Sequence, residues 1–194
     1  MRRAVSVAVL LLGLGACGPV RHATIRGDFE QVDKKTLLRL VVITAPLPAN
    51  DPQVGAMWSA MGRRYANHHR DFIAKEERAE AVMPADLCRE GIDGLLHLSP
   101  TLSREADGVQ VEVQGRLLRC KDGVEVWSAA SGGSWPSQDP HVSTVIDEYQ
   151  GEYGSRVTPF IAPSFHALRA LLDTLPRPVL EKDEDIMEKI ELGE

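Results

Sequence analysis

The 194-residue sequence lacks most of the motifs that indicate a particular chemistry. It contains no phosphate-binding loop, dinucleotide fingerprint or zinc motif, and Ser131-Gly132-Gly133-Ser134 lacks the spacing of a hydrolase nucleophile elbow. An excess of basic residues is also missing, because the formal net charge is -6, and this argues against a nucleic-acid partner. We therefore expect no enzyme, no catalytic residues, no cofactor and no bound metal.

Long hydrophobic runs are missing as well. The apolar stretch at residues 4–12 is about half as long as the roughly 20 residues that a membrane-spanning helix needs. Arg2 and Arg3 precede it and small residues follow, a pattern typical of a secretory signal peptide, here residues 1–16. Leu14-Gly15-Ala16-Cys17 resembles the lipobox of bacterial lipoproteins, which implies cleavage before Cys17 and acylation of that cysteine. The alternative is an ordinary signal peptide that is cut a few residues later.

The lipobox resemblance also implies a location. Gly18 stands where an Asp commonly retains Gram-negative lipoproteins in the inner membrane, so the implied location is the periplasmic face of the outer membrane. Several acyl chains on one residue hold a protein firmly at a bilayer. We expect residues 17–36 to form a lipidated tether, which could extend at most roughly 60 Å.

Cysteines are few. The sequence has three, and if Cys17 is acylated, Cys88 and Cys120 remain. In an oxidising compartment we expect these two to form a disulfide, since both lie at the same end of a predicted hairpin. The alternatives are two buried thiols or a zinc pair, and the zinc pair is disfavoured because no further Cys or His lies at ligand spacing.

Apolar patterning predicts one globular domain over residues 37–176. Asp-Gly pairs at 107–108 and 122–123 separate runs with alternating apolar residues, which is a strong signal for two consecutive hairpins. Strands are expected at 37–44, 71–74, 92–98, 109–120 and 124–128, helices at 56–66, 85–90, 142–153 and 164–175, and a loop at 132–140. We expect Ser164 to cap the last helix.

The predicted fold class is α/β (α+β), with a single mixed sheet that includes a three-stranded antiparallel meander and with helices packed against it. Residues 177–194 are acidic, and we expect a tail in which Ile186 and Ile190 could form the apolar side of a frayed helix.

Part of this pattern resembles a known module. Gly91-Ile92-Asp93-Gly94-Leu95-Leu96, a valine-rich strand, Leu117-Leu118-Arg119, Asp122-Gly123 and Val126-Trp127 are similar to the small α/β domain of envelope proteins. These proteins include the curli-secretion and Pel exopolysaccharide lipoproteins and the amino-terminal domain of the Tol translocation protein. His68-His69-Arg70-Asp71 and Leu175-Pro176-Arg177-Pro178 resemble segments of an uncharacterised bacterial outer-membrane lipoprotein family. The resemblance implies a role in export or envelope assembly and brings no activity.

Histidines offer the first candidate site. His68 and His69 are adjacent, and neighbouring side chains on a helix point about 100° apart, so they seldom bind one metal. A metal site would require His97, His141 or His166 to fold close to them. The alternative is a solvated helix end, where imidazoles and arginines interact favourably with the helix dipole.

Asp93 and two tryptophans are the other candidate functional residues. Asp93 could be a catalytic carboxylate, but its place after Gly91 at the start of a strand is better explained as turn chemistry. Trp127 is expected in the core. Trp135, in the predicted loop, is a possible interaction residue, and the alternative is that it is buried under that loop.

These observations favour a non-enzymatic, lipid-anchored outer-membrane protein that faces the periplasm and acts in envelope assembly or export. Its expected partners are the membrane, through acylated Cys17, and envelope proteins or further copies of itself. The second hypothesis is a membrane-anchored module that binds a small ligand or a glycan. The third, a hydrolase, requires a nucleophile within hydrogen-bond reach of a histidine.

Overall fold

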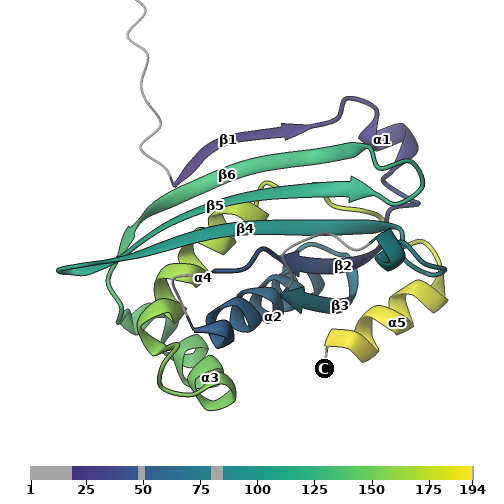
Figure 1. Cartoon of the computed structure of the whole chain (residues 1–194). Helices are drawn as coiled ribbons and strands as arrows, with labels where there is room; N and C mark the ends of the chain where they lie inside the picture. The colour runs from purple at the N-terminus through teal and green to yellow at the C-terminus, as the bar shows by residue number, and fades with distance from the viewer. Residues whose placement is uncertain (1–18, 48–50, 80–84, 194) are drawn as a thin grey trace, which may run out of the picture.

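A computed structural model describes residues 19–47, 51–79 and 85–193. It contains one mixed six-stranded sheet in the order β1-β6-β5-β4-β2-β3, with helices packed against it (Figure 1). The central strand β2 pairs in parallel with β3 and β4, whereas β4, β5, β6 and β1 are antiparallel. The predicted fold class, including the three-stranded meander, is therefore confirmed.

Strands and helices alternate in the first part of the chain, and three consecutive antiparallel strands form the meander that follows. The strands are β1 (Val20–Ile25), β2 (Arg39–Thr44), β3 (Ile73–Ala79), β4 (Gly94–Glu105), β5 (Gly108–Arg119) and β6 (Glu125–Trp135). The helices are α1 (Phe29–Val32), α2 (Pro52–His69), α3 (Ser143–Tyr153), α4 (Thr158–Leu172) and α5 (Asp183–Gly193), with short 3₁₀ turns at Ala85–Leu87 and Pro140–Val142. No helix in these described ranges is both long and apolar enough to cross a bilayer.

The meander strands are longer than the sequence pattern predicts. β4 and β5 stay paired from Gly94 opposite Arg119 to Glu105 opposite Gly108. β6 continues through Gly132 and Gly133 to Trp135, so the expected loop at 132–140 is wrong in its first part. Both strand positions favour glycine, because a Cβ at Gly132 would lie 2.9 Å from the carbonyl oxygen of Val111 and one at Gly133 would lie 2.9 Å from the indole of Trp135.

Helices α2 and α4 cover one face of the sheet and enclose the main core. Alternate residues of β5, Val109, Val111 and Val113, are buried against them, as period-2 patterning requires. Trp58 from α2 and Trp127 from β6 are among the largest fully buried side chains, and the prediction that Trp127 lies in the core is confirmed. The fold thus rests on two helices that come from distant parts of the chain.

The last two helices differ from their prediction. α4 begins at Thr158 with Pro159 in its first turn, where the missing N–H costs no helical hydrogen bond. Ser164 is therefore a buried residue inside the helix and not its cap. In α5, Ile186 and Ile190 are exposed, and the inner side carries Asp185, whose carboxylate pairs with Arg39 of β2 at 2.5 Å.

Residues 20–35 differ most from expectation, because they form structure where we predicted a tether. β1 pairs with β6 from Val20 opposite Ser131 to Ile25 opposite Trp127, and α1 follows directly. Most β1 side chains are exposed on both faces, so the strand has no apolar alternation that a sequence pattern could reveal. Phe29 of α1 is buried and attaches this segment to the core.

Candidate functional site

The residue proposed for lipidation, Cys17, lies outside the described residues. The sheet begins three residues later, at Val20. β1 is an edge strand, and Figure 1 shows it along the margin of the sheet opposite to β3.

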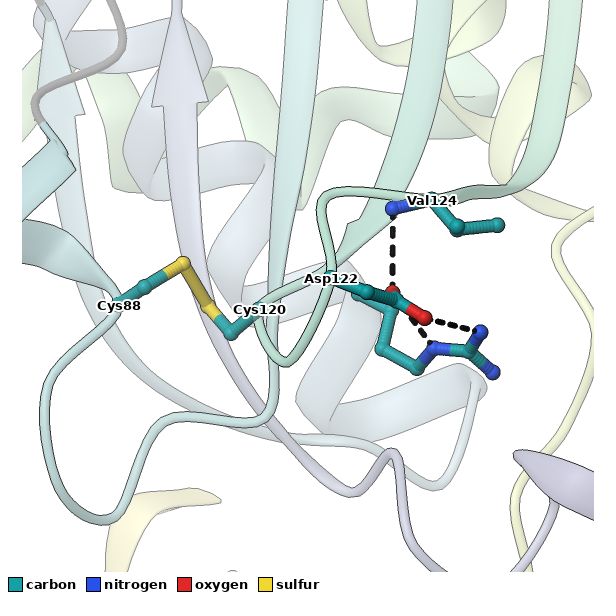
Figure 2. Close-up of a disulfide and its surroundings, with 5 residues drawn as sticks. Cys88, Cys120, Asp122 and Val124 are labelled. Atoms are coloured by element: carbon teal, nitrogen blue, oxygen red, sulfur yellow. Dashed lines mark hydrogen bonds and ion pairs between the residues drawn. A yellow bond between two sulfur atoms is a disulfide. The ribbon is translucent and has the colours of Figure 1, made fainter.

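Cys88 and Cys120 form the predicted disulfide, with their Cα atoms 5.2 Å apart (Figure 2). The bond joins the segment before β4 to the turn after β5. That segment covers a second, smaller apolar cluster on the face of the sheet away from α2, formed by Val41, Ile43, Leu87, Ile92 and Leu95. The disulfide therefore fixes a cover over the middle of the sheet.

A cleft of about 360 Å³ lies beside the disulfide, and two of its charged side chains, Asp93 and Arg119, are engaged in bonds within the protein. Asp93 accepts hydrogen bonds from the backbone N–H groups of Leu38 and Arg39, at 3.0 and 2.7 Å. Its carboxylate thus links the start of β2 to the start of β4, which is a structural role but a long-range one, where the sequence predicts local turn chemistry. Arg119, also in this cleft, binds the fully buried carboxylate of Asp33 at 2.8 Å.

The turn after β5 holds the same arginine from its other side. Asp122 accepts hydrogen bonds from the Arg119 guanidinium at 2.7 and 2.9 Å and from the backbone N–H of Val124 at 3.2 Å (Figure 2). These hydrogen bonds lower the pKa of the Asp122 carboxyl to about 2, and those from Arg119 contribute most. The Asp-Gly turn is therefore locked by its own side chain, and the charged groups of Asp93 and Arg119 in this cleft are both held by bonds within the protein.

The requirement of the hydrolase hypothesis is met at one place in the described ranges. Ser99 Oγ lies 3.4 Å from Nδ1 of His97, on the solvated face of the sheet. Burial lowers the pKa of His97, and the charge of Arg116 adds to this effect. None of the hydrogen bonds and ion pairs of the described chain joins this imidazole to a carboxylate that could orient it, as a nucleophile–base pair needs.

Trp135 is half-buried and packs on the main core. Its ring stacks on His166 of α4, with centroids 6.1 Å apart, and the His166 Nε2 lies 2.9 Å from Asp139. The ring and hydrogen-bond contacts of this histidine within the described chain are therefore with Trp135, Phe165 and Asp139, and none of them is with His68 or His69. No group of three metal-ligating side chains occurs among the residues that the structure describes.

A polar cavity lies where α2 and α4 end. It has a volume of about 490 Å³, within the range of small-ligand pockets. Its walls come from α2, the turn after it, α4 and the segment after α4. The lining residues are Tyr65, His68, His69, Asp71, Phe165, Arg169, Asp173 and Arg177. We call this cavity the α2–α4 cleft.

The turn that forms one wall of the cleft is fixed by several bonds. The Asn67 side chain exchanges two hydrogen bonds with the backbone of Ala74, at 2.7 and 3.1 Å. Lys189 of α5 donates to the carbonyls of Asn67 and Phe72, at 2.6 and 3.2 Å. Between them Asp71 has a φ of +63°, the left-handed conformation that usually falls to glycine after a helix. The turn thus presents a carboxylate from a strained backbone position.

The two segments that resemble the lipoprotein family meet at this cleft. The Arg70 guanidinium donates a hydrogen bond to the carbonyl of Leu175, and the Arg177 guanidinium lies 3.7 Å from the Asp71 carboxylate. The prediction of a solvated end of α2 agrees with the exposure of His68 and His69. That this helix end forms one wall of a cavity could not be predicted from the sequence, because the opposite wall lies about a hundred residues later.

A smaller cavity of about 200 Å³ continues the α2–α4 cleft toward α3. The two share Tyr65, His68, His69 and Phe165, while Met61 and Tyr149 add an apolar and aromatic wall. The Tyr65 hydroxyl donates to Asp173 at 2.6 Å. Burial and this bond raise the Tyr65 pKa, so the phenol stays protonated.

Comparison with known proteins assigns no family. No protein-family model matches the chain, and no curated protein matches it. Among solved structures it is similar to the PelC dodecamer from Paraburkholderia phytofirmans, with a TM-score of 0.40 and 17% identity over 72% of this chain and 98% of that one.

Two further structures show a similarity of the same order. A point variant of that PelC dodecamer gives a TM-score of 0.36 and 14% identity, over 69% of this chain and 91% of the other. TolB from Acinetobacter baumannii gives 0.28 and 14%, over 69% of this chain and 31% of TolB. The motifs in the sequence resemble both kinds of protein. A structural similarity this distant transfers neither their assembly nor their activity to this chain.

Proposed function

We propose that the protein is a non-enzymatic lipoprotein, anchored through acylated Cys17 at the periplasmic face of the outer membrane, that acts through contacts with other envelope proteins or with further copies of itself. The observation that carries the proposal is the sequence Leu14-Gly15-Ala16-Cys17 after a short apolar run, followed at Val20 by the sheet. Three residues span at most about 10 Å. An acylated Cys17 would therefore hold the domain against the bilayer.

The edge strand supports the part of the proposal that concerns protein contacts. Among the residues that the structure describes, β1 pairs on one side only, with β6, so its other side has no strand partner from these residues. Its last residue, Ile25, is 47% exposed. An edge strand of this kind can accept a strand from another chain.

The test combines mass spectrometry with crosslinking. The intact mass of the protein from the membrane fraction should correspond to a chain that begins at acylated Cys17, and gentle crosslinking of the same sample should yield multimers or hetero-complexes. Cys17→Ser is the matched control and should be neither acylated nor retained in the membrane. An unmodified soluble monomer from the native sequence would refute the anchor and the assembly role together.

A second candidate function, the binding of a small ligand by the anchored domain, is supported by a different observation. The α2–α4 cleft joins charged groups at one end to an aromatic wall at the other, within a cavity of suitable size. Equilibrium dialysis against candidate ligands would separate the two functions, because a purely structural protein should bind none of them.

A further inference from the structure

We propose that the α2–α4 cleft is a binding site for a phosphoryl group, which Arg169, Arg177, His68 and His69 would hold. The proposal concerns the second candidate function and does not depend on the lipid anchor. It rests on three observations: two loosely held guanidinium groups, an excess of positive charge around the cavity, and a rigid wall.

Arg169 and Arg177 are held more loosely than most other arginines of the described residues. Their nearest carboxylate oxygens lie at 3.9 and 3.7 Å, beyond hydrogen-bond distance, and their side chains are 60% and 61% exposed. Arg39 and Arg119, by contrast, bind carboxylates at 2.5 and 2.8 Å and are largely buried. The two guanidinium groups of the cleft therefore have donors to offer to an oxyanion.

The carboxylates of the cleft do not neutralise its cations. Asp173 accepts the Tyr65 hydroxyl, and Asp71 lies between Arg177 and Lys189, at 3.7 and 3.8 Å. Arg70 lies behind the wall and donates to a backbone carbonyl, while its buried Nε has no partner in the described chain. The lining holds two arginines and two aspartates, and Arg70 and Lys189 beside it add two further basic side chains, in a protein whose net charge is negative.

The pKa values of three neighbouring groups are shifted mainly by burial and, less strongly, by the charges of the cleft, where Asp71 or Asp173 opposes the arginines. Burial lowers the pKa of Lys189, of Arg70 and of His69, and in each case the charge of Arg177 adds to the effect. His69 is also affected by His68 and Arg169. A bound anion would relieve this repulsion and would favour the charged form of each group.

The number of donors fits a phosphoryl group better than a carboxylate. Two guanidinium groups and two imidazoles line the cavity, more donors than the two oxygens of a carboxylate can use, whereas a phosphate ester presents three oxygens. Phe165 and Tyr65 form the neighbouring wall, with ring centroids 6.5 Å apart. The rest of a phosphorylated ligand would contact these rings.

Isothermal titration calorimetry of the full-length mature chain carrying Cys17→Ser, in buffer without detergent, tests the proposal, because this chain bears no acyl groups that would insert into vesicles. The probes are inorganic phosphate, acetate at equal ionic strength, and phosphatidylcholine vesicles with and without phosphatidylglycerol. We expect saturable binding of inorganic phosphate, weaker by at least about tenfold in the double variant Arg169→Gln/Arg177→Gln. The control is Arg21→Gln/Arg116→Gln, which removes the same charge from exposed arginines elsewhere and should bind as the wild type does.

The outcomes are distinct. Binding of inorganic phosphate assigns the site to the phosphoryl group itself, and response to phosphatidylglycerol vesicles alone assigns it to a lipid headgroup. Equal affinity for acetate and phosphate would overturn the proposal, as would equal weakening in both double variants, since this would show a general charge effect. Failure here would leave the acylation and crosslinking results untouched, because neither of them involves the cleft.

Discussion

Removal of the Cys88–Cys120 disulfide should cost the protein a large part of its stability. The bond closes a loop between residues separated by 32 positions. In the chain-entropy description, closing a loop of this size restricts the unfolded chain by about 3–4 kcal/mol. Because the total stability of a domain is about 5–15 kcal/mol, this single bond contributes a substantial fraction.

The structure adds a local consequence to this global one. The bond fixes the segment that covers Val41, Ile43 and Leu95 on one face of the sheet, and Leu87 and Ile92 of that segment are themselves buried. Without the bond the cover should open more often than the rest of the molecule. Amide hydrogen exchange should therefore accelerate in residues 85–93 before it accelerates in β5.

Urea unfolding of Cys88→Ser/Cys120→Ser, followed by tryptophan fluorescence, measures the global effect. Both this variant and its reference carry Cys17→Ser, so that acylation does not differ. With a slope of about 2 kcal/mol/M, the midpoint should fall by about 1.5–2 M, and the slope should rise because the unfolded chain is less compact. Reduction of the reference protein should reproduce the shift. A fall of less than about 0.5 M would refute the argument from loop closure.

Three other perturbations have expected outcomes that differ in sign or size. Arg119→Ala leaves the buried Asp33 carboxylate without its partner and should cost about 3–5 kcal/mol in urea unfolding, whereas loss of the exposed pair in Arg116→Ala should cost less than about 1 kcal/mol. Gly115→Ala would place a methyl group against Trp127 and Leu171 and should destabilise the protein by about 1–3 kcal/mol. Gly151→Ala, on an exposed part of α3, should stabilise the protein by about 0.5–1 kcal/mol, and equal effects of the two variants would contradict the packing around Gly115. Burial lowers the pKa of His97, so at this residue the unfolded chain binds more protons than the folded one, and the stability should fall as the pH drops from 7 to 5. In thermal unfolding, His97→Gln should reduce this loss of stability, and an unchanged pH profile would count against the argument.

Local signals predicted the meander and the disulfide, and failed where structure depends on distant partners. Asp-Gly turns and valine alternation identify β4 to β6 because both are properties of neighbouring residues. β1 has no such pattern, since its position comes from backbone pairing with β6. In α5 the inner side carries ion pairs of Asp185 and Glu188 with Arg39, so apolar periodicity indicated the wrong side.

The α2–α4 cleft shows the same limit for function. His68 and His69 drew attention as a possible metal pair, but the groups that accompany them in the structure, Arg169 and Arg177, lie about a hundred residues later and belong to other elements. For Asp93, the sequence predicts turn chemistry, whereas its carboxylate accepts hydrogen bonds from the backbone of Leu38 and Arg39, which are distant in sequence. A site assembled from the ends of several helices can be predicted only when the fold is known.

The place of β1 at the edge of the sheet has a consequence for the order of events during synthesis. Val20 pairs with Ser131, so the first strand of the chain has no partner until about a hundred further residues are available. Throughout that interval residues 20–25 cannot join the sheet, and Cys17 lies just upstream of an unpaired segment.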